Sequence, residues 1–487
     1  MNTRRADVDD LALAVATAAR HPAGRTTLES LLDTGDPRQW LTLDFGVRRL
    51  PWFWPADLPS MVWLEMAEPP PGEPVLAVAL CHPDGRVRQA ALERAAGVPA
   101  LLPLVAVRCS DWVGPVRDVA RALLRAGLAG AAPRTVALVA AVALRTAVRR
   151  HGAHAHDLLM EILESADAEV TDTLLDSRDP ATRRLGHRIA VRRNLLSPAR
   201  LARIAATDAD VVVQDVCADA VLAHMKDGRH GELLEPLLRA RAPRVRASGV
   251  TALHRTGRHD EATAFLADRA GIVRACARWV LWQRGADPLP RYRELCAGPS
   301  ADVPPGAAAG LGECGTREDA ALLLPLLAHP VARVRVRAVA ALCALGTVDA
   351  ERLRPLLDDP SAAVTREVST ALVSSGGRLP ESCLWERLAA DRPRHVRAAA
   401  FRLLATQRGI FQLRCCLTLL DDADHRLRAQ ARTAVLRWGP ADAPTAYAAL
   451  PADERARLDE LIDRATPVLG EDKVRLLRFY LRAGHRS

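Results

Sequence analysis

The sequence predicts an all-α fold, a solenoid of about eleven or twelve HEAT-sized helical hairpins with atypical helical caps at its ends. The first observation behind this prediction is a repeat whose copies start 28–32 residues apart from Thr182 onward. The second is that the clearest copies carry apolar residues at helical spacing and end at a glycine, which suits the left-handed position after a helix. Because one hairpin cannot bury its apolar face alone, neighbouring hairpins are expected to stack.

The repeated motif predicts the second helix of each hairpin. It starts at a valine or leucine, continues through alanine-rich residues and reaches a glycine 12 or 13 positions later, in residues 245–257, 273–285, 303–315, 334–346, 364–376, 396–409 and 427–439. Weaker copies begin at Val87, Val116, Thr182 and Val213. The 66-residue gap from Val116 to Thr182 equals two periods, so a degenerate copy is expected near residues 135–165. Apolar segments before the motif, such as residues 321–330, predict the first helices.

This repeat resembles that of the HEAT-repeat family, in its bacterial HEAT-like or PBS-lyase-type form. The resemblance is carried by a polar turn followed by V-R-x-x-A-x-x-A-L, as in HPVARVRVRAVAALCALG (329–346) and DRPRHVRAAAFRLLATQRG (391–409). It extends over residues 80–440. It implies an α-solenoid and is nearly silent about function, because one fold serves many functions.

The resemblance also implies a ladder of hydrogen bonds between adjacent turns, formed by an Asp and an Arg six residues later. That spacing occurs in Asp111/Arg117, Asp268/Arg274, Asp391/Arg397 and Asp422/Arg428. Arginine stands at the ladder position in eight copies, at Arg88, Arg117, Arg183, Arg246, Arg274, Arg335, Arg397 and Arg428. A planar guanidinium suits the role because it can bridge carboxylates. The copy at Val303 has Pro304-Pro305 instead, so a bend or interruption is expected there.

Three regions are predicted along the chain. Residues 1–72 form an N-terminal helical cap rich in Trp, residues 73–440 the solenoid, and residues 441–487 a C-terminal cap of two or three helices. The boundary after the first cap is the proline-rich EPPPGEP at 68–74. The first cap contains Trp40, Phe45, Trp52, Phe53, Trp54 and Trp63.

Composition excludes several classes of function. Only Lys226 and Lys473 among the 67 basic residues are lysine, and no phosphate-binding loop of the G-x-x-x-x-G-K type occurs. Neither lysine lies in an apolar stretch that would favour a Schiff base. GLGECG (310–315) matches a dinucleotide fingerprint, but its last glycine is the repeat's own stop and no strand precedes it. We therefore expect no cofactor.

Localisation is predicted from apolar runs and cysteines. The longest apolar run, residues 135–144, is shorter than the roughly 20 residues of a membrane span, so no membrane association is expected. The ten cysteines include no C-x-x-C pair and lie mostly in apolar stretches, which indicates buried thiols in a reducing cytoplasm. HGAHAHD (151–157) offers either a polar loop or a metal site, and the loop is favoured.

Net charge leaves nucleic acid as a less favoured partner. Residues 73–440 carry +12, within a total of +9. A basic surface of this kind is typical of phosphate-backbone binding. However, eight of the arginines occupy ladder positions, and arginines that face Asp groups would not form an open basic stripe.

We therefore expect a non-enzymatic scaffold that binds another protein. Its expected contacts are exposed positions on second helices and aromatic residues near the cap, namely Trp52, Trp54, Arg121, Arg278, Trp282, Phe401 and Arg432. Trp52 and Trp54 belong to PWFWP (51–55), which could instead pack against the first repeat. The alternative is a nucleic-acid-binding protein, with DNA glycosylase activity through Trp40 and Asp44 as one form. Bilin-lyase activity rests on fold alone.

Overall fold

The computed structural model describes residues 2–19, 26–49, 61–68, 71–225, 233–299, 302–376, 379–406, 409–439 and 442–482. Every regular element within these ranges is a helix, so the fold is all-α as predicted. The chain forms two compact units, Met1–Ser248 and Gly249–Ser487, with the boundary inside one helix. Each unit is described by itself.

Twelve helical pairs occupy the described part of residues 73–439. The first helices are α4 (Glu73–Leu80), α6 (Leu102–Arg108), α8 (Pro133–Thr146), α10 (Ala168–Leu175), α12 (Pro198–Thr207), α14 (Leu234–Leu238), the 3-10 helix η6 (His259–Phe265), α17 (Leu289–Ala297), α19 (Ala320–Leu323) with η9 (Pro325–Ala328), α21 (Ala350–Leu353) with η10 (Arg354–Asp358), α23 (Glu381–Leu388) and α25 (Ile410–Thr418). Short 3-10 turns η3 (Pro99–Leu101), η8 (Arg317–Asp319) and η11 (Leu419–Asp421) flank some of them.

The second helices coincide with the sequence motif. They are α5 (Gly85–Arg94), α7 (Gly114–Leu128), α9 (Ala153–Ser165), α11 (Pro180–Arg192), α13 (Val211–His224), α15 (Pro243–Arg255), α16 (Gly271–Gln283), α18 (Pro305–Cys314), α20 (Ala332–Ala344), α22 (Ala362–Ser375), α24 (Arg394–Thr406) and α26 (His425–Arg437). The pair α8/α9 is the degenerate copy expected near residues 135–165, so that prediction is confirmed.

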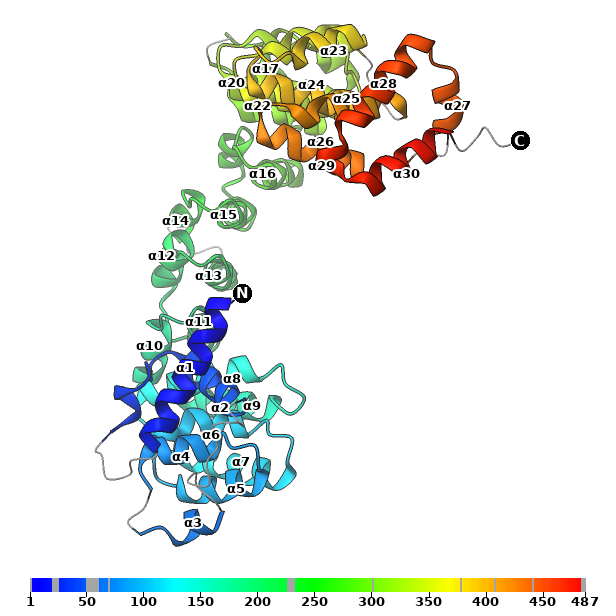
Figure 1. Cartoon of the computed structure of the whole chain (residues 1–487). Helices are drawn as coiled ribbons and strands as arrows, with labels where there is room; N and C mark the ends of the chain where they lie inside the picture. The colour runs from blue at the N-terminus through cyan, green and yellow to red at the C-terminus, as the bar shows by residue number, and fades with distance from the viewer. Residues whose placement is uncertain are drawn as a thin grey trace. The chain divides into compact units, whose positions relative to one another are not determined.

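Apolar residues of successive pairs form the core of each unit. In unit 1, α5 packs against α7, α7 against α9 and α11 against α13, over a core that includes Val116, Leu124 and Leu159. In unit 2, α18, α20, α22 and α24 follow one another side by side (Figure 1). Each pair thus contacts mainly its neighbours, as in other repeat proteins.

The glycine stop has its expected backbone conformation in most repeats. Gly346 and Gly376 have φ of 66° and 67°, a region in which a Cβ is disfavoured. Gly257, Gly285 and Gly409 are also left-handed. Gly315 differs, with φ of −80°, and Gly439 also does not have a positive φ.

Helix α18 does not interrupt the stack at Pro304-Pro305. Pro305 is its first residue, where a missing N–H costs nothing, and the helix packs against α17 and α20 and also contacts α16. The expected interruption is therefore wrong. Pro at the first helical turn is compatible with a regular second helix.

The terminal segments are helical. Near the N-terminus lie α1 (Asn2–Ala19), the 3-10 turn η1 (Leu28–Ser30), α2 (Pro37–Val47) and α3 (Met61–Met66); α1 packs on α2 and α4, and α2 reaches α6 and α8. The C-terminal helices are α27 (Ala443–Ala448), α28 (Ala452–Arg464), α29 (Thr466–Leu469) and α30 (Glu471–Arg482). Of these, α27 and α28 pack on α25, and α29 packs on α26.

Candidate functional site

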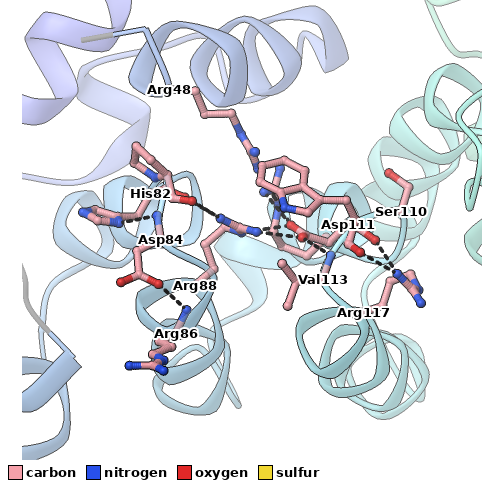
Figure 2. A network of polar contacts seen from close by, with 12 residues as sticks. Arg48, His82, Asp84, Arg86, Arg88, Ser110, Asp111, Val113 and Arg117 are labelled. Atoms are coloured by element: carbon pink, nitrogen blue, oxygen red, sulfur yellow. Dashed lines mark hydrogen bonds and ion pairs between the residues drawn. The ribbon is translucent and has the colours of Figure 1, made fainter. Parts of the chain in front are cut away.

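A network of arginine and aspartate joins the turns of unit 1 around Asp111. Arg88 Nε and Nη2 donate to the two carboxylate oxygens of Asp111 at 2.9 and 2.7 Å (Figure 2). Arg88 Nη1 donates to the carbonyls of His82 and Pro83, both at 2.8 Å, in the turn that precedes its own helix. One guanidinium therefore caps its own turn and holds the Asp of the next turn.

The same contact recurs in both units, which confirms the ladder for four of the eight predicted arginines, counting Arg88. Arg183, Arg335 and Arg397 donate through two nitrogens to Asp208, Asp359 and Asp422 respectively. Each Asp lies 24 or 25 residues after its Arg, in the following turn. These two-point contacts fix the register of adjacent hairpins.

Several rungs depart from this pattern. In the α13 repeat, Gln214 replaces the arginine and donates from Nε2 to the Asp208 carbonyl at 2.6 Å. In the α16 repeat, Arg274 reaches Glu313 on α18. Glu313 also accepts from Arg278 Nη1 at 2.7 Å, so two arginines share one glutamate.

Helix α2 adds a second buried carboxylate to the Asp111 network. Asp44 accepts from Arg48 Nε at 3.0 Å and from Arg108 Nη2, and Arg149 Nη1 lies 3.8 Å from its other oxygen. Arg108 also donates to Asp111 at 3.0 Å, which links the two carboxylates. Burial raises the pKa of Asp44, and the contacts with Arg48 and Arg149 oppose that rise.

The turn of residues 109–113, here called the Ser110 turn, carries an excess of positive charge. Five arginines contact this turn or the Asp44 carboxylate of α2, namely Arg48, Arg88, Arg108, Arg117 and Arg149. Trp112 in the same turn is 63% exposed. The guanidinium carbons of Arg48 and Arg88 lie 4.4 Å from its ring centroid, which is a cation–π distance.

The outer edge of this network is formed by the α8–α9 turn and α7. Desolvation and the charges of Arg117, Arg150 and Arg121 lower the pKa of His151. Desolvation and the charges of Arg121 and Arg125 lower the pKa of His154. His154 lies in the first turn of α9, so the expected loop at 151–157 is partly helical. Across the described residues, no three His, Cys, Asp or Glu side chains gather as a metal site.

The residues predicted to contact a partner lie in different environments. Trp282 is 52% exposed, Arg432 is exposed and Arg121 is half-buried. Arg278 and Phe401 are 8% and 6% exposed, so the expectation that they face solvent is wrong. Arg278 turns inward to Glu313 and Tyr292, and Phe401 belongs to the unit 2 core. Trp52 and Trp54 lie outside the described residues.

Trp279 and Trp282 form an exposed aromatic surface on α16. Trp279 is 40% exposed, and its ring packs edge-on to His254 at 5.3 Å between centroids. His254 Nδ1 lies 3.0 Å from Nε2 of His259. Both tryptophans therefore reach solvent.

The Trp40 and Asp44 pair does not form a base-binding site. Trp40 is buried and its Nε1 donates to the Thr34 carbonyl at 3.0 Å. Asp44 is held by arginines, as described above. Trp40 lines the wall of a groove of about 1390 Å³, formed with Arg38, Glu73, Arg134 and Asp179, but Asp44 does not.

Sequence reasoning missed Arg48 and Arg149, and it singled out Asp44 only for a different role, as a possible glycosylase residue. Asp44 and Arg48 lie at i and i+4 near the end of one helix, and Arg149 follows an apolar helix in the pair Arg149-Arg150. No repeat position marks them, so only the packing of α2 on α6 and α8 brings them together.

No protein-family model and no curated protein matches the chain. Among solved structures, it is similar to the karyopherin Kap121p bound to the SUMO protease Ulp1p, at 15% identity and a TM-score of 0.39 over 83% of this chain and 52% of that one. It is also similar to importin beta, at 12% identity and a TM-score of 0.33 over 98% of this chain and 68% of that one. The chain thus spans about half the length of Kap121p. No helix in the described ranges is long and apolar enough to cross a membrane.

Proposed function

We propose that this chain is a non-enzymatic scaffold of the HEAT-like type that binds another protein. The observation that carries the proposal is the exposed pair Trp279 and Trp282 beside His254. Aromatic residues are 4% of this sequence, and two tryptophans on the surface of one helix are costly to leave in water. Tryptophan is also enriched among the residues that dominate protein–protein affinity.

We further propose a reducing cytoplasm as its compartment. All ten cysteines are free thiols, and burial raises the pKa of Cys109 and Cys217 to about 12, which keeps both protonated and unreactive.

Nucleic-acid binding remains the second candidate, supported by the charge excess at the Ser110 turn. Elsewhere the ladder leaves few arginines free to bind nucleic acid, because Asp208, Asp359 and Asp422 neutralise the arginines of their rungs. A mobility shift with duplex DNA at rising salt tests this candidate, since backbone binding weakens steeply with salt.

The scaffold function is tested by affinity capture with the full chain and with Trp279→Ala/Trp282→Ala. The matched control is Phe479→Ala, which removes an exposed aromatic side chain from α30. We expect the double variant to lose at least one captured protein that the wild type and Phe479→Ala retain, with unchanged thermal melts. Identical captured sets for all three chains would reject the proposal.

A further inference from the structure

We propose that Arg117, Arg149 and Arg150 form an oxyanion site that takes the phosphate group of a phosphomonoester, as on a phosphorylated side chain of a partner protein. The protein partner rests on the proposed scaffold function, whereas the oxyanion site does not. The inference starts from one rung of the ladder that lacks its carboxylate.

The missing carboxylate is evident from the spacing of the other rungs. Arg88, Arg183, Arg335 and Arg397 find an Asp 23–25 residues later. From Arg117 that offset falls on Ala140–Val142, which are buried and apolar inside α8. Helix α8 has 14 residues, whereas α6 has 7 and α10 has 8, so its extra turns displace the following loop.

Arg117 therefore has only half of the usual contacts. Its Nη1 donates to the carbonyls of Asp111 at 2.8 Å and Trp112 at 3.2 Å, as Arg88 does in its own turn. Within the described residues, no carboxylate contacts its other nitrogens, the ones that in Arg88 hold Asp111. Figure 2 shows Arg117 on the side of Asp111 opposite to Arg88.

Basic residues occupy the turn that should supply the carboxylate. Residues 147–152 include Arg149, Arg150 and His151. Arg149 Nη1 lies 3.4 Å from Ser110 Oγ, so Arg117 and Arg149 both contact the Ser110 turn. Besides desolvation, the positive charges of Arg117, Arg150 and Arg121 act on His151 and lower its pKa. Like charges gathered in this way favour a bound anion.

The net positive charge of this cluster and its small size favour a phosphomonoester over a nucleic-acid backbone. Five guanidinium groups and two carboxylates lie around this turn, an excess of three positive charges, and a phosphomonoester supplies about −1.5 to −2 at pH 7. A planar guanidinium group can also donate two parallel hydrogen bonds to phosphate oxygens. The neighbouring arginines already have carboxylate partners, since Arg88 pairs with Asp111 and Arg145 pairs with Asp179. A nucleic-acid backbone would need a longer row of open cations.

The site is tested by calorimetric titration of the full chain with inorganic phosphate, at low ionic strength and without other oxyanions. We expect saturable one-site binding to the wild type, and binding at least tenfold weaker to Arg149→Ala/Arg150→Ala. The matched control is Arg426→Ala/Arg437→Ala, which removes the same charge from exposed positions of α26 and should leave binding unchanged. A third variant, His151→Asp, supplies an internal carboxylate; it should weaken phosphate binding and raise the melting temperature.

Two outcomes would overturn the oxyanion site: absence of saturation with the wild type, or equal weakening in both double variants. A second titration identifies the ligand, since O-phosphoserine should displace phosphate and dimethyl phosphate, with one charge, should not. Tight binding of a single-stranded oligonucleotide that Arg149→Ala/Arg150→Ala abolishes would replace the phosphomonoester with nucleic acid. These titrations need no partner protein, so their failure is distinguishable from failure of the Trp279 and Trp282 capture experiment.

Discussion

The contact between Arg88 and Asp111 shows how single residues hold adjacent hairpins together. Both side chains are fully buried, and the carboxylate also accepts from Arg108 Nη1 and from the Val113 amide at 3.0 Å. A buried ion pair adds little net stability, because desolvation offsets most of the attraction. Its effect lies in register, since removing one partner leaves charges buried without compensation.

Asp111→Ala is therefore expected to destabilise the protein by about 3–5 kcal/mol, because Arg88 and Arg108 lose their shared carboxylate. Urea unfolding measures the change. Asp157→Ala is the matched control, since its exposed carboxylate contacts the partly exposed His156 and its loss should leave stability nearly unchanged. Equal urea midpoints for Asp111→Ala and Asp157→Ala would contradict the proposed role of the Arg88–Asp111 contact in stability.

At the scale of the element, α18 shows that a sequence motif can serve packing instead of ligand binding. The glycines of GLGECG allow close approach: a Cβ on Gly310 would lie 2.0 Å from the Tyr292 ring, and one on Gly312 would lie 2.5 Å from the Ala341 backbone. Tyr292 is fully buried, and its hydroxyl donates to the Leu266 carbonyl at 2.9 Å. The resemblance to a dinucleotide fingerprint thus follows from helix contacts.

Gly310→Ala is expected to destabilise the protein by about 1–3 kcal/mol, although alanine is the better helix former by about 1 kcal/mol. The cause is the clash with Tyr292, a ring held by packing and a hydrogen bond. Gly127→Ala in α7 is the control, because its Cβ would meet only the end of the flexible Leu102 side chain. Thermal unfolding of both variants checks the difference, and a Gly310→Ala variant as stable as wild type would contradict it.

At the scale of the whole molecule, the ladder makes stability depend on ionised carboxylates in both units. Burial raises the pKa of Asp208, but hydrogen bonds from Arg183 and the Asp210 amide outweigh it and leave the pKa below its usual value. The same balance, with Arg397, lowers the pKa of Asp422. For Asp319, the hydrogen bond from Arg293 is the main cause of the lowered pKa.

These shifts predict acid lability with a defined sign. A carboxylate whose folded pKa lies below its unfolded value of about 3.9 stabilises the fold above that pH, and its contribution disappears as pH falls through the folded pKa. The contribution of the ladder carboxylates to the melting temperature should therefore be nearly constant from pH 7 to pH 5 and fall below about pH 4. The double variant Asp208→Asn/Asp422→Asn should have a lower melting temperature than the wild type at pH 7. Its melting temperature should then fall less than that of the wild type between pH 5 and pH 3. An equal acid-induced drop in this variant would count against the ladder as its cause.

The sequence by itself determined the all-α class, the repeat period, eleven of the second helices and the ladder positions of the arginines, because these depend on residue types at local spacings of four to 30 positions. It could not determine which side of a helix faces its neighbours, so Arg278 and Phe401 were expected at the surface and lie buried. Only the tertiary structure joined Asp44 to Arg108 and Arg149, because α2 packs across α6 and α8 from a distant part of the chain. The open rung at Arg117 likewise results from the length of α8, a feature of packing that no local motif records.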